Sequence, residues 1–232
     1  MTTPASPRVW IPLEANPEVL TALIHKLGVP TDYIFHDVYG LDPELLQMVP
    51  QPVHALLFLF PINKQTQELP TPENTDGDIP LRTFFAKQTI PNACGTMALI
   101  HSILNTPEIV DKLPQDSWFL KFLHNSLSLS PDQRAEVLNQ DETLSQCHTE
   151  SSHAGQSTVP ITEEELENVW LHFIAFVPID NKLVELDGRR EAPVVHGATS
   201  QESFLNDVVP IIQKYITATE SIEFNLMALV KM

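Results

Sequence analysis

Residues 87–100 read KQTIPNACGTMALI, which predicts a turn followed by a buried helix with a thiol at its start. Pro91 and Asn92 interrupt the segment that precedes them, and Asn92 is the expected N-cap of a helix. From Ala93 to Leu104 almost every residue is apolar or small, which predicts a helix surrounded by protein. Cys94 then stands in the first helical turn, where unpaired backbone N–H groups and the helix dipole favour the thiolate, the nucleophilic form.

The surroundings of Cys94 decide between two interpretations of this residue. A cysteine on an apolar helix is more often a small buried side chain than a nucleophile. A nucleophilic thiol needs a base, and the base needs an orienting group. His172 enters an apolar run of β type at 171–177, and Asp187 ends a second run that starts at 183. The turn residues at 179–182 predict a hairpin that brings His172 and Asp187 side by side. Gln88 carries an amide that can donate to an oxyanion beside the Cys94 N–H.

Three stretches carry a family resemblance. They are Gln88 with NACGT at 92–96, LHFI at 171–174 and ELDGR at 185–189. Together they resemble the signature of the ubiquitin carboxyl-terminal hydrolase (UCH) family of cysteine peptidases. Further similar stretches are PLEANP at 12–17, DVYG at 37–40, VPQPV at 49–53, HAGQ at 153–156 and HG at 196–197. The similarity covers nearly the whole chain, in order, at the length of the small single-domain members.

The resemblance implies a fold, an activity and a set of site residues. The fold is α/β (α+β) and papain-like, with a central, mostly antiparallel sheet flanked by helices and a knotted backbone. Residues 1–232 form a single catalytic domain, with an active-site crossover loop at about 141–168 that limits the leaving group. The activity is that of a deubiquitinating thiol hydrolase that acts at the C-terminal glycine of ubiquitin and needs no metal or other cofactor. The catalytic residues are Cys94, His172, Asp187 and Gln88, and the expected ubiquitin contacts are Glu14, Asn16, His153, Gly155 and Gln156.

Composition limits the class of protein. The chain has 232 residues, 43% of them hydrophobic, which suits one sizeable core. The formal net charge of −17 argues against nucleic acid and anionic membranes as partners. It favours a basic partner, although an acidic surface that only aids solubility is the commoner explanation. The N-terminus lacks the features of a signal peptide. We therefore expect a cytoplasmic or also nuclear protein, and the family resemblance implies a monomer that binds ubiquitin and, as a further partner, a close ubiquitin-like modifier.

The remaining elements follow from periodicity, caps and breakers. Asn16 and Pro17 open a helix that Gly28 closes, and Ser130 caps another. Further helices are expected at 43–48, 115–127, 131–138 and 200–216, the last kinked or divided by Pro210. Strands are expected at 33–38, 54–60, 82–85 and 222–230, and a surface loop at 63–79. The acidic stretch 141–168 is expected to be a mobile loop with one short helix at 162–167, capped by Thr162 and Glu165.

Other histidines and other functions remain as alternatives. His148 and His153 lie near Cys147, but their spacing matches no zinc pattern. His101 stands two turns after Cys94 and is expected to be a packed core residue. A different Cys-His-Asp acyl transferase, such as an arylamine N-acetyltransferase, is disfavoured because its arginine-glycine context is missing before Cys94. A ubiquitin-binding or ubiquitin-stabilising protein with little turnover is the alternative from another class.

Overall fold

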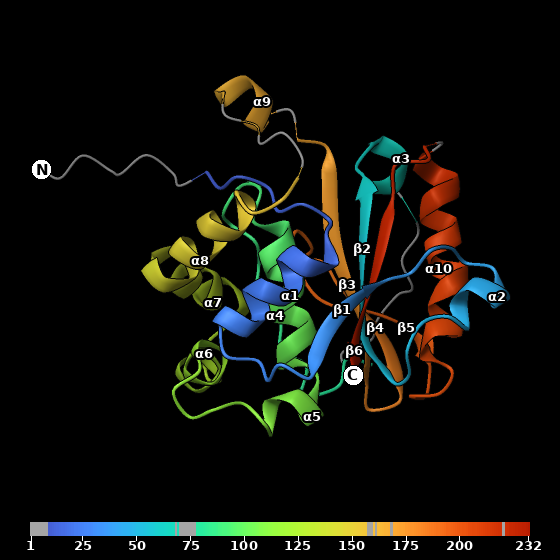
Figure 1. Cartoon of the computed structure of the whole chain (residues 1–232), viewed down its shortest axis with the longest axis horizontal. Coiled ribbons are helices and arrows are strands. Elements are labelled where there is room, and N and C mark those ends of the chain that lie inside the picture. Colours follow the sequence, from blue (N-terminus) through green and yellow to red (C-terminus); the bar gives the residue numbers. More distant parts are fainter. Residues whose placement is uncertain are drawn as a thin grey trace, which may run out of the picture.

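The helices and strands form three layers (Figure 1). The computed structural model describes residues 9–67, 69, 78–156, 160, 162–167, 169–219 and 221–232. The helices are α1 (Pro17–Lys26), α2 (Pro43–Leu46), α3 (Lys64–Gln67), α4 (Cys94–Leu104), α5 (Pro107–Val110), α6 (Trp118–Ser126), α7 (Pro131–Gln140), α8 (Glu142–Ser152), α9 (Glu163–Glu167) and α10 (Phe204–Thr219). The strands are β1 (Tyr33–Asp37), β2 (Val53–Pro61), β3 (Leu171–Ile179), β4 (Lys182–Leu186), β5 (Val194–Ala198) and β6 (Asn225–Lys231).

One sheet of six strands, in the order β1-β6-β2-β3-β4-β5, forms the middle layer. Each pair of neighbouring strands is antiparallel, as expected. Side chains alternate between its faces because the period of a strand is two residues. In β2, Leu57 faces α4 and its companions, whereas Phe58 faces α10. Both faces are therefore covered by helices, and the strands are apolar on both sides. The predicted knot stays a prediction.

Helix α4 is the central element of the larger helical layer (Figure 1). Each of its residues from Cys94 to Leu104 is buried. Its first turn lies close against the lead-in segment and β3, because a Cβ atom on Gly95 would come within 3.2 Å of Leu13 and 3.4 Å of Phe173. A larger residue at that position would have to displace these side chains by a few tenths of an ångström. The packing fixes the start of α4, and with it Cys94, against the end of β3.

The predicted hairpin between β3 and β4 is confirmed. Ala175 pairs with Leu186, and Ile179 pairs with Lys182 next to the turn. Asp180 and Asn181 have φ values of 49° and 60°, the left-handed conformation that a tight two-residue hairpin turn requires. The hairpin therefore places the start of β3 beside the end of β4.

Helix caps are confirmed at two positions and wrong at a third. Asn16 accepts hydrogen bonds from the backbone N–H groups of Glu18 and Val19 at the start of α1. Ser130 forms a complete capping box with Gln133 at α7. Asn92 does not cap α4, since Ala93 occupies the N-cap and no side chain caps that helix end. Asn92 instead adopts a left-handed φ of 62°, which turns its side chain away from the helix.

The predicted strand at 82–85 is wrong, although its backbone is paired. The N–H of Phe84 donates to Asn105 Oδ1 at 2.7 Å, and its carbonyl accepts from Asn105 Nδ2 at 2.8 Å. One amide side chain at the end of α4 thus satisfies the groups that a neighbouring strand would otherwise bind. The segment remains irregular and leads to Gln88.

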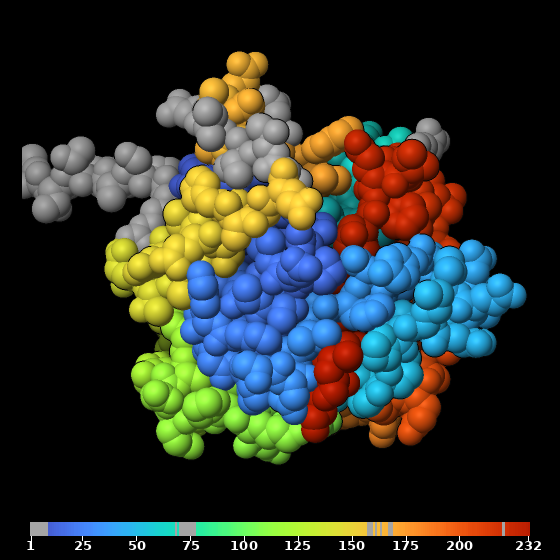
Figure 2. Space-filling model, viewed as in Figure 1, coloured from blue at the N-terminus to red at the C-terminus, as the bar shows by residue number. Residues whose placement is uncertain are grey.

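The acidic stretch 141–168 is not a loop throughout, which corrects the prediction. Its first half is α8, capped by Asp141, whose Oδ1 accepts from the N–H of Leu144 at 2.8 Å. Figure 2 shows that α8 covers one side of α1, and Lys26 and Glu150 join the two helices with an ion pair of 3.0 Å. The buried face of α8 is largely polar, so hydrophobic periodicity did not reveal it. The capped helix at 162–167 is confirmed as α9, with Thr162 and Glu165 in reciprocal hydrogen bonds.

At the C-terminal end, α10 covers the second face of the sheet and β6 lies between β1 and β2 (Figure 1). Pro210 stands inside α10 and does not divide it. Of the loop expected at 63–79, the structure gives α3 at its start, and residues 68 and 70–77 lie outside the described residues. Among the residues that are described, no helix is long and apolar enough to cross a membrane.

Candidate active site

Three predicted residues meet at one end of the neighbouring strands β3 and β4. Cys94 comes from the first turn of α4, on one face, and His172 from the start of β3. Asp187 directly follows β4, and its Oδ1 lies 2.7 Å from His172 Nε2. The ring of His172 contacts Phe60 on the α10 side of the sheet. The thiol therefore comes from the α4 side of the sheet and the imidazole lies on the α10 side, and the two meet where β3 begins.

The electrostatics of this group favour an ion pair. Burial alone raises the pKa of the Cys94 thiol, but the hydrogen bond with His172 and the charge of that ring outweigh it and lower the pKa. Burial lowers the pKa of His172, yet Asp187 and Cys94 raise it to about 9. Burial likewise raises the pKa of Asp187, and the bond to His172 then brings it below its ordinary value. The hydrogen bonds and charges of the group therefore favour the thiolate form of Cys94 and the carboxylate form of Asp187 beside a protonated His172 ring.

Gln88 lines the same cavity as Cys94 and His172. Its Nε2 donates to the carbonyl of Ile90 at 3.2 Å, which uses one of the two amide hydrogens. Its backbone N–H donates to the carbonyl of Gly188 at 2.7 Å. A Cβ on Gly188 would lie 2.9 Å from Gln88 Cβ, so glycine is needed there. The loops that carry Gln88 and Asp187 are thus locked together.

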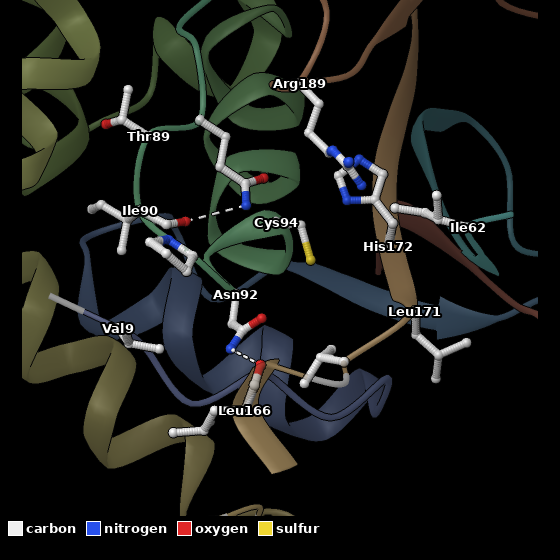
Figure 3. Close-up of a pocket in the computed structure, with 13 residues that line it drawn as sticks. Val9, Ile62, Thr89, Ile90, Asn92, Cys94, Leu166, Leu171, His172 and Arg189 are labelled. Atoms are coloured by element: carbon white, nitrogen blue, oxygen red, sulfur yellow. Dashed lines mark hydrogen bonds between the residues drawn. The ribbon is translucent and has the colours of Figure 1, made fainter. Parts of the chain in front are cut away.

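Two cavities flank Cys94. The larger, of about 900 Å³, is lined by Gln88, Cys94, His172 and Arg189 among others. Figure 3 shows the Cys94 sulfur directed into this cavity, with the His172 ring on the adjacent wall. The smaller, of about 420 Å³, is lined by Glu14, Cys94 and Phe173 among others. Val169 and Leu171 line both cavities. An extended substrate can therefore lie across the thiol with one part in each cavity.

Asn92 ties the segment before β3 to the start of α4. Its Nδ2 donates to the carbonyl of Leu166 at 3.1 Å, a bond drawn in Figure 3. Leu166 belongs to α9 and lines the larger cavity. The sequence predicts Asn92 as a helix cap and does not predict this contact with Leu166. An asparagine between Pro91 and an apolar helix fits a cap and a left-handed turn equally well, so no signal in the sequence separates them.

Only some of the five residues predicted to contact ubiquitin lie beside the cavities that flank Cys94. Glu14 lines the smaller cavity. Gly155 lies against Glu14, since a Cβ atom on Gly155 would come within 2.5 Å of Glu14 Oε2. Asn16 caps α1 and donates to Glu14 Oε1 at 3.0 Å, so its side chain has a structural role. His153 and Gln156 are exposed beyond the end of α8. Contact with ubiquitin remains a prediction for all five.

The two other histidines near the site are built into the core. His148 Nε2 lies 2.7 Å from the carbonyl oxygen of Ile11, and its Nδ1 lies 2.7 Å from Thr96 Oγ1. His148 therefore joins α8, the lead-in segment and α4. His101 is buried, stacks on Phe85 and lies 3.1 Å from the carbonyl oxygen of Ala86. Burial lowers the pKa of each ring to about 4, so both are neutral. The residues that the structure describes contain no group of three side chains suited to a metal ion.

Comparison with known proteins identifies the family. The family described as "Ubiquitin carboxyl-terminal hydrolase, family 1" matches residues 10–217. A ubiquitin carboxyl-terminal hydrolase of Aplysia californica is 42% identical over 91% of this chain and 97% of its own length. The isozyme L1 of Rattus norvegicus is 37% identical over 95% of this chain and 97% of its own.

A solved structure supports the fold. The catalytic domain of Trichinella spiralis UCH37, bound to ubiquitin vinyl methyl ester, superimposes with a TM-score of 0.74 at 23% identity. The match covers 97% of both chains. At this identity, the likeness establishes the papain-like arrangement of helices and sheet. The family match and the relatives extend over nearly the whole chain, and the chain belongs to the ubiquitin carboxyl-terminal hydrolase family.

Proposed function

We propose that this chain is a thiol-dependent deubiquitinase that cleaves amide, ester or thioester bonds at the C-terminal glycine of ubiquitin. The observation that carries the proposal is the Cys94–His172–Asp187 group, with a thiol of lowered pKa beside an imidazole whose pKa is raised to about 9. Family membership supplies ubiquitin as the acyl part of the substrate. Residues 1–232 act as one catalytic domain and as a monomer, and a close ubiquitin-like modifier is a second substrate.

Each residue has a separate role in the reaction. The Cys94 thiolate attacks the glycine carbonyl, and the carbonyl oxygen becomes an oxyanion. The Cys94 N–H at the helix start and the second Gln88 amide hydrogen stabilise that charge. The intermediate collapses as His172 donates its proton to the leaving amine, which leaves a thioester on Cys94. His172 then deprotonates a water molecule, whose attack on the thioester releases ubiquitin and the thiolate.

Asp187 supports both halves of this reaction. Because its carboxylate accepts from His172 Nε2, the other ring nitrogen, Nδ1, is left for the thiol and the leaving group. The carboxylate also stabilises the imidazolium while the thiolate is present. No step requires a metal or an organic cofactor.

The two cavities suit the two parts of the substrate. We place the tail of ubiquitin, which is basic, in the smaller cavity beside Glu14, and the leaving group in the larger one. The net charge of −17 likewise favours a partner with a basic tail, and it disfavours nucleic acid. The α9 segment, tied to Asn92, restricts the larger cavity and favours small adducts or peptide extensions.

Hydrolysis of a fluorogenic amide at the C-terminus of full-length ubiquitin tests this function. We expect saturable turnover by the native chain, and none by Cys94→Ala, which should still bind ubiquitin. The matched control is Cys147→Ser, which removes the other free thiol and should turn over at the native rate. Binding without turnover by the native chain would instead support a ubiquitin-binding or ubiquitin-stabilising protein.

A further inference from the structure

A buried polar cluster lies behind the candidate catalytic residues. At its centre is Glu185 of β4, whose side chain is 0% exposed. Its Oε1 accepts from Arg190 Nε at 3.0 Å and from the Tyr215 hydroxyl at 3.0 Å. Its Oε2 lies 2.8 Å from His196 Nε2. A buried carboxylate is costly unless charges and hydrogen bonds compensate it, and Glu185 has both.

The position of Glu185 follows from strand geometry. Leu183, two residues earlier in β4, packs in the apolar cluster on the α10 side of the sheet. Glu185 points to the same side because side chains alternate along a strand. Tyr215 reaches it from α10, and His196 reaches it from β5. The cluster therefore joins β4, which leads directly into Asp187, to α10 and β5.

Arg190 connects this cluster to Asp187. Its Nε, bonded to Glu185, also lies 4.0 Å from Asp187 Oδ2, and its NH2 group donates to the Tyr215 hydroxyl at 3.2 Å. The two oxygens of Asp187 thus have different partners. Oδ1 accepts from His172 Nε2 and from the N–H of Arg189 at 2.9 Å, and Oδ2 faces the guanidinium. A rotation of the Asp187 carboxylate would break the two hydrogen bonds that Oδ1 accepts and would move Oδ2 away from the Arg190 guanidinium.

We propose that Arg190, held by Glu185 and Tyr215, is a positioning residue that fixes the Asp187 carboxylate against His172. The inference deepens the proposed function and rests on it only for the kinetic readout, since it concerns the Asp187–His172 contact itself. These contacts connect α10 to Asp187 through Glu185 and Arg190, so the packing of α10 contributes to the alignment of Asp187 with His172. Arg190 lines neither of the two cavities that flank Cys94.

The titration of His172 separates positioning from a simple effect of charge. If Arg190 acted only through its positive field, its removal would stabilise the imidazolium and raise the pKa of His172. If Arg190 holds Asp187 in place, its removal frees the carboxylate and lowers that pKa. The other titratable or charged groups around the Asp187–His172 pair are Cys94 and His101 from α4 and Arg189 from the loop after β4. None of them changes in the variants described next.

The experiment measures the pKa of His172 from its ring proton NMR signals, assigned with His172→Gln. This readout needs no ubiquitin, so it remains valid if the proposed function fails. We expect Arg190→Gln to lower the pKa of His172 and Arg190→Lys, which keeps the charge, to leave it near the native value. Tyr215→Phe removes one anchor of both Arg190 and Glu185 and should lower the pKa by less. Should Arg190→Gln not fold, Tyr215→Phe decides the result.

Kinetics on the ubiquitin amide provide the second readout. We expect Arg190→Gln to lower kcat by about tenfold with little change in KM, because a misplaced catalytic group affects the chemical step. The matched control is Arg82→Gln, which breaks an exposed pair with Asp180 at the opposite end of β3 and should change neither kcat nor the titration of His172. An unchanged or raised pKa of His172 in Arg190→Gln overturns the inference, as does a native kcat.

Discussion

Asp187 Oδ1 lies 2.7 Å from Nε2 of His172, so the imidazole is anchored through the nitrogen that faces away from the thiol. The side chain of Asp187 is 13% exposed and that of His172 is 4% exposed, which limits competition from water. In such an environment a charge-assisted hydrogen bond is stronger than at the surface. This contact determines which ring nitrogen serves Cys94 and keeps the ring protonated near neutral pH.

Replacement of Asp187 by Asn tests this contact. The amide keeps the shape of the carboxylate but removes its charge, and it can present a donor to Nε2 instead of an acceptor. We expect kcat on the ubiquitin amide to fall by roughly a hundredfold or more. The pKa of His172, measured by NMR, should fall at the same time. A variant with native kcat would show that Asp187 is only a turn residue before Gly188.

The oxyanion role of Gln88 predicts a different kinetic pattern. Gln88→Ala should lower kcat by about 10²- to 10³-fold while KM changes little, because the amide acts on charge that develops in the transition state. Gln88→Glu, which has the same size and no donor in its ionised form, should lose as much. If both variants lose ubiquitin affinity and keep kcat, Gln88 is a binding residue.

The pH dependence of activity should reflect the raised pKa of His172. Activity needs the imidazolium to protonate the leaving amine, so kcat/KM should decline at high pH with a midpoint near pH 9.

The free energy of unfolding should depend on the same titration of His172. The pKa of His172 is higher in the folded chain than its ordinary value of 6.5, so its contribution to stability is complete below about pH 6.5 and is lost as the pH rises through about 9. Denaturant titrations across this range measure it, with Asp187→Asn as the comparison.

His148 and His101 predict the opposite trend on the acid side. Each has a folded pKa of about 4, below the ordinary 6.5, because burial disfavours the charged ring. The unfolded chain therefore binds more protons between these values, and the free energy of unfolding should decrease as the pH falls from about 6.5 to 4. In His148→Gln this decrease should be smaller than in the native chain. An equal decrease in both proteins would contradict the neutral bridge from α8 to Ile11 and Thr96.

Some parts of the structure could be predicted from the sequence because local chemistry determines them. The all-buried α4 followed from its continuous apolar composition, and the β3–β4 hairpin followed from Asp180 and Asn181, which tolerate the left-handed turn. The hairpin accounts for the meeting of His172 and Asp187, whereas the place of Cys94 beside them depends on the packing of α4 against β3 and was implied only by the family resemblance. The caps by Asn16 and Ser130 were likewise set by their nearest neighbours in the chain.

Other parts depend on contacts that are distant in sequence. Helix α8 buries His148, Ser151 and Ser152, and a polar buried face has no hydrophobic period to detect. The segment at 82–85 has strand-like composition, but Asn105 occupies its hydrogen-bonding groups. Asn92 was expected to cap α4 because its partner, the carbonyl of Leu166, lies 74 residues further along. The cluster around Glu185 depends on Tyr215 in the same way.

Covalent capture by full-length ubiquitin that carries an electrophile in place of its C-terminal carboxylate directly tests whether the thiolate of Cys94 attacks the end of ubiquitin. Peptide mass spectrometry of the adduct identifies the cysteine that reacts. We predict one ubiquitin per chain, attached at Cys94, with full labelling of Cys147→Ser and none of Cys94→Ala. Failure of the folded native chain to react, or labelling that persists in Cys94→Ala, would contradict the attack of Cys94 on ubiquitin.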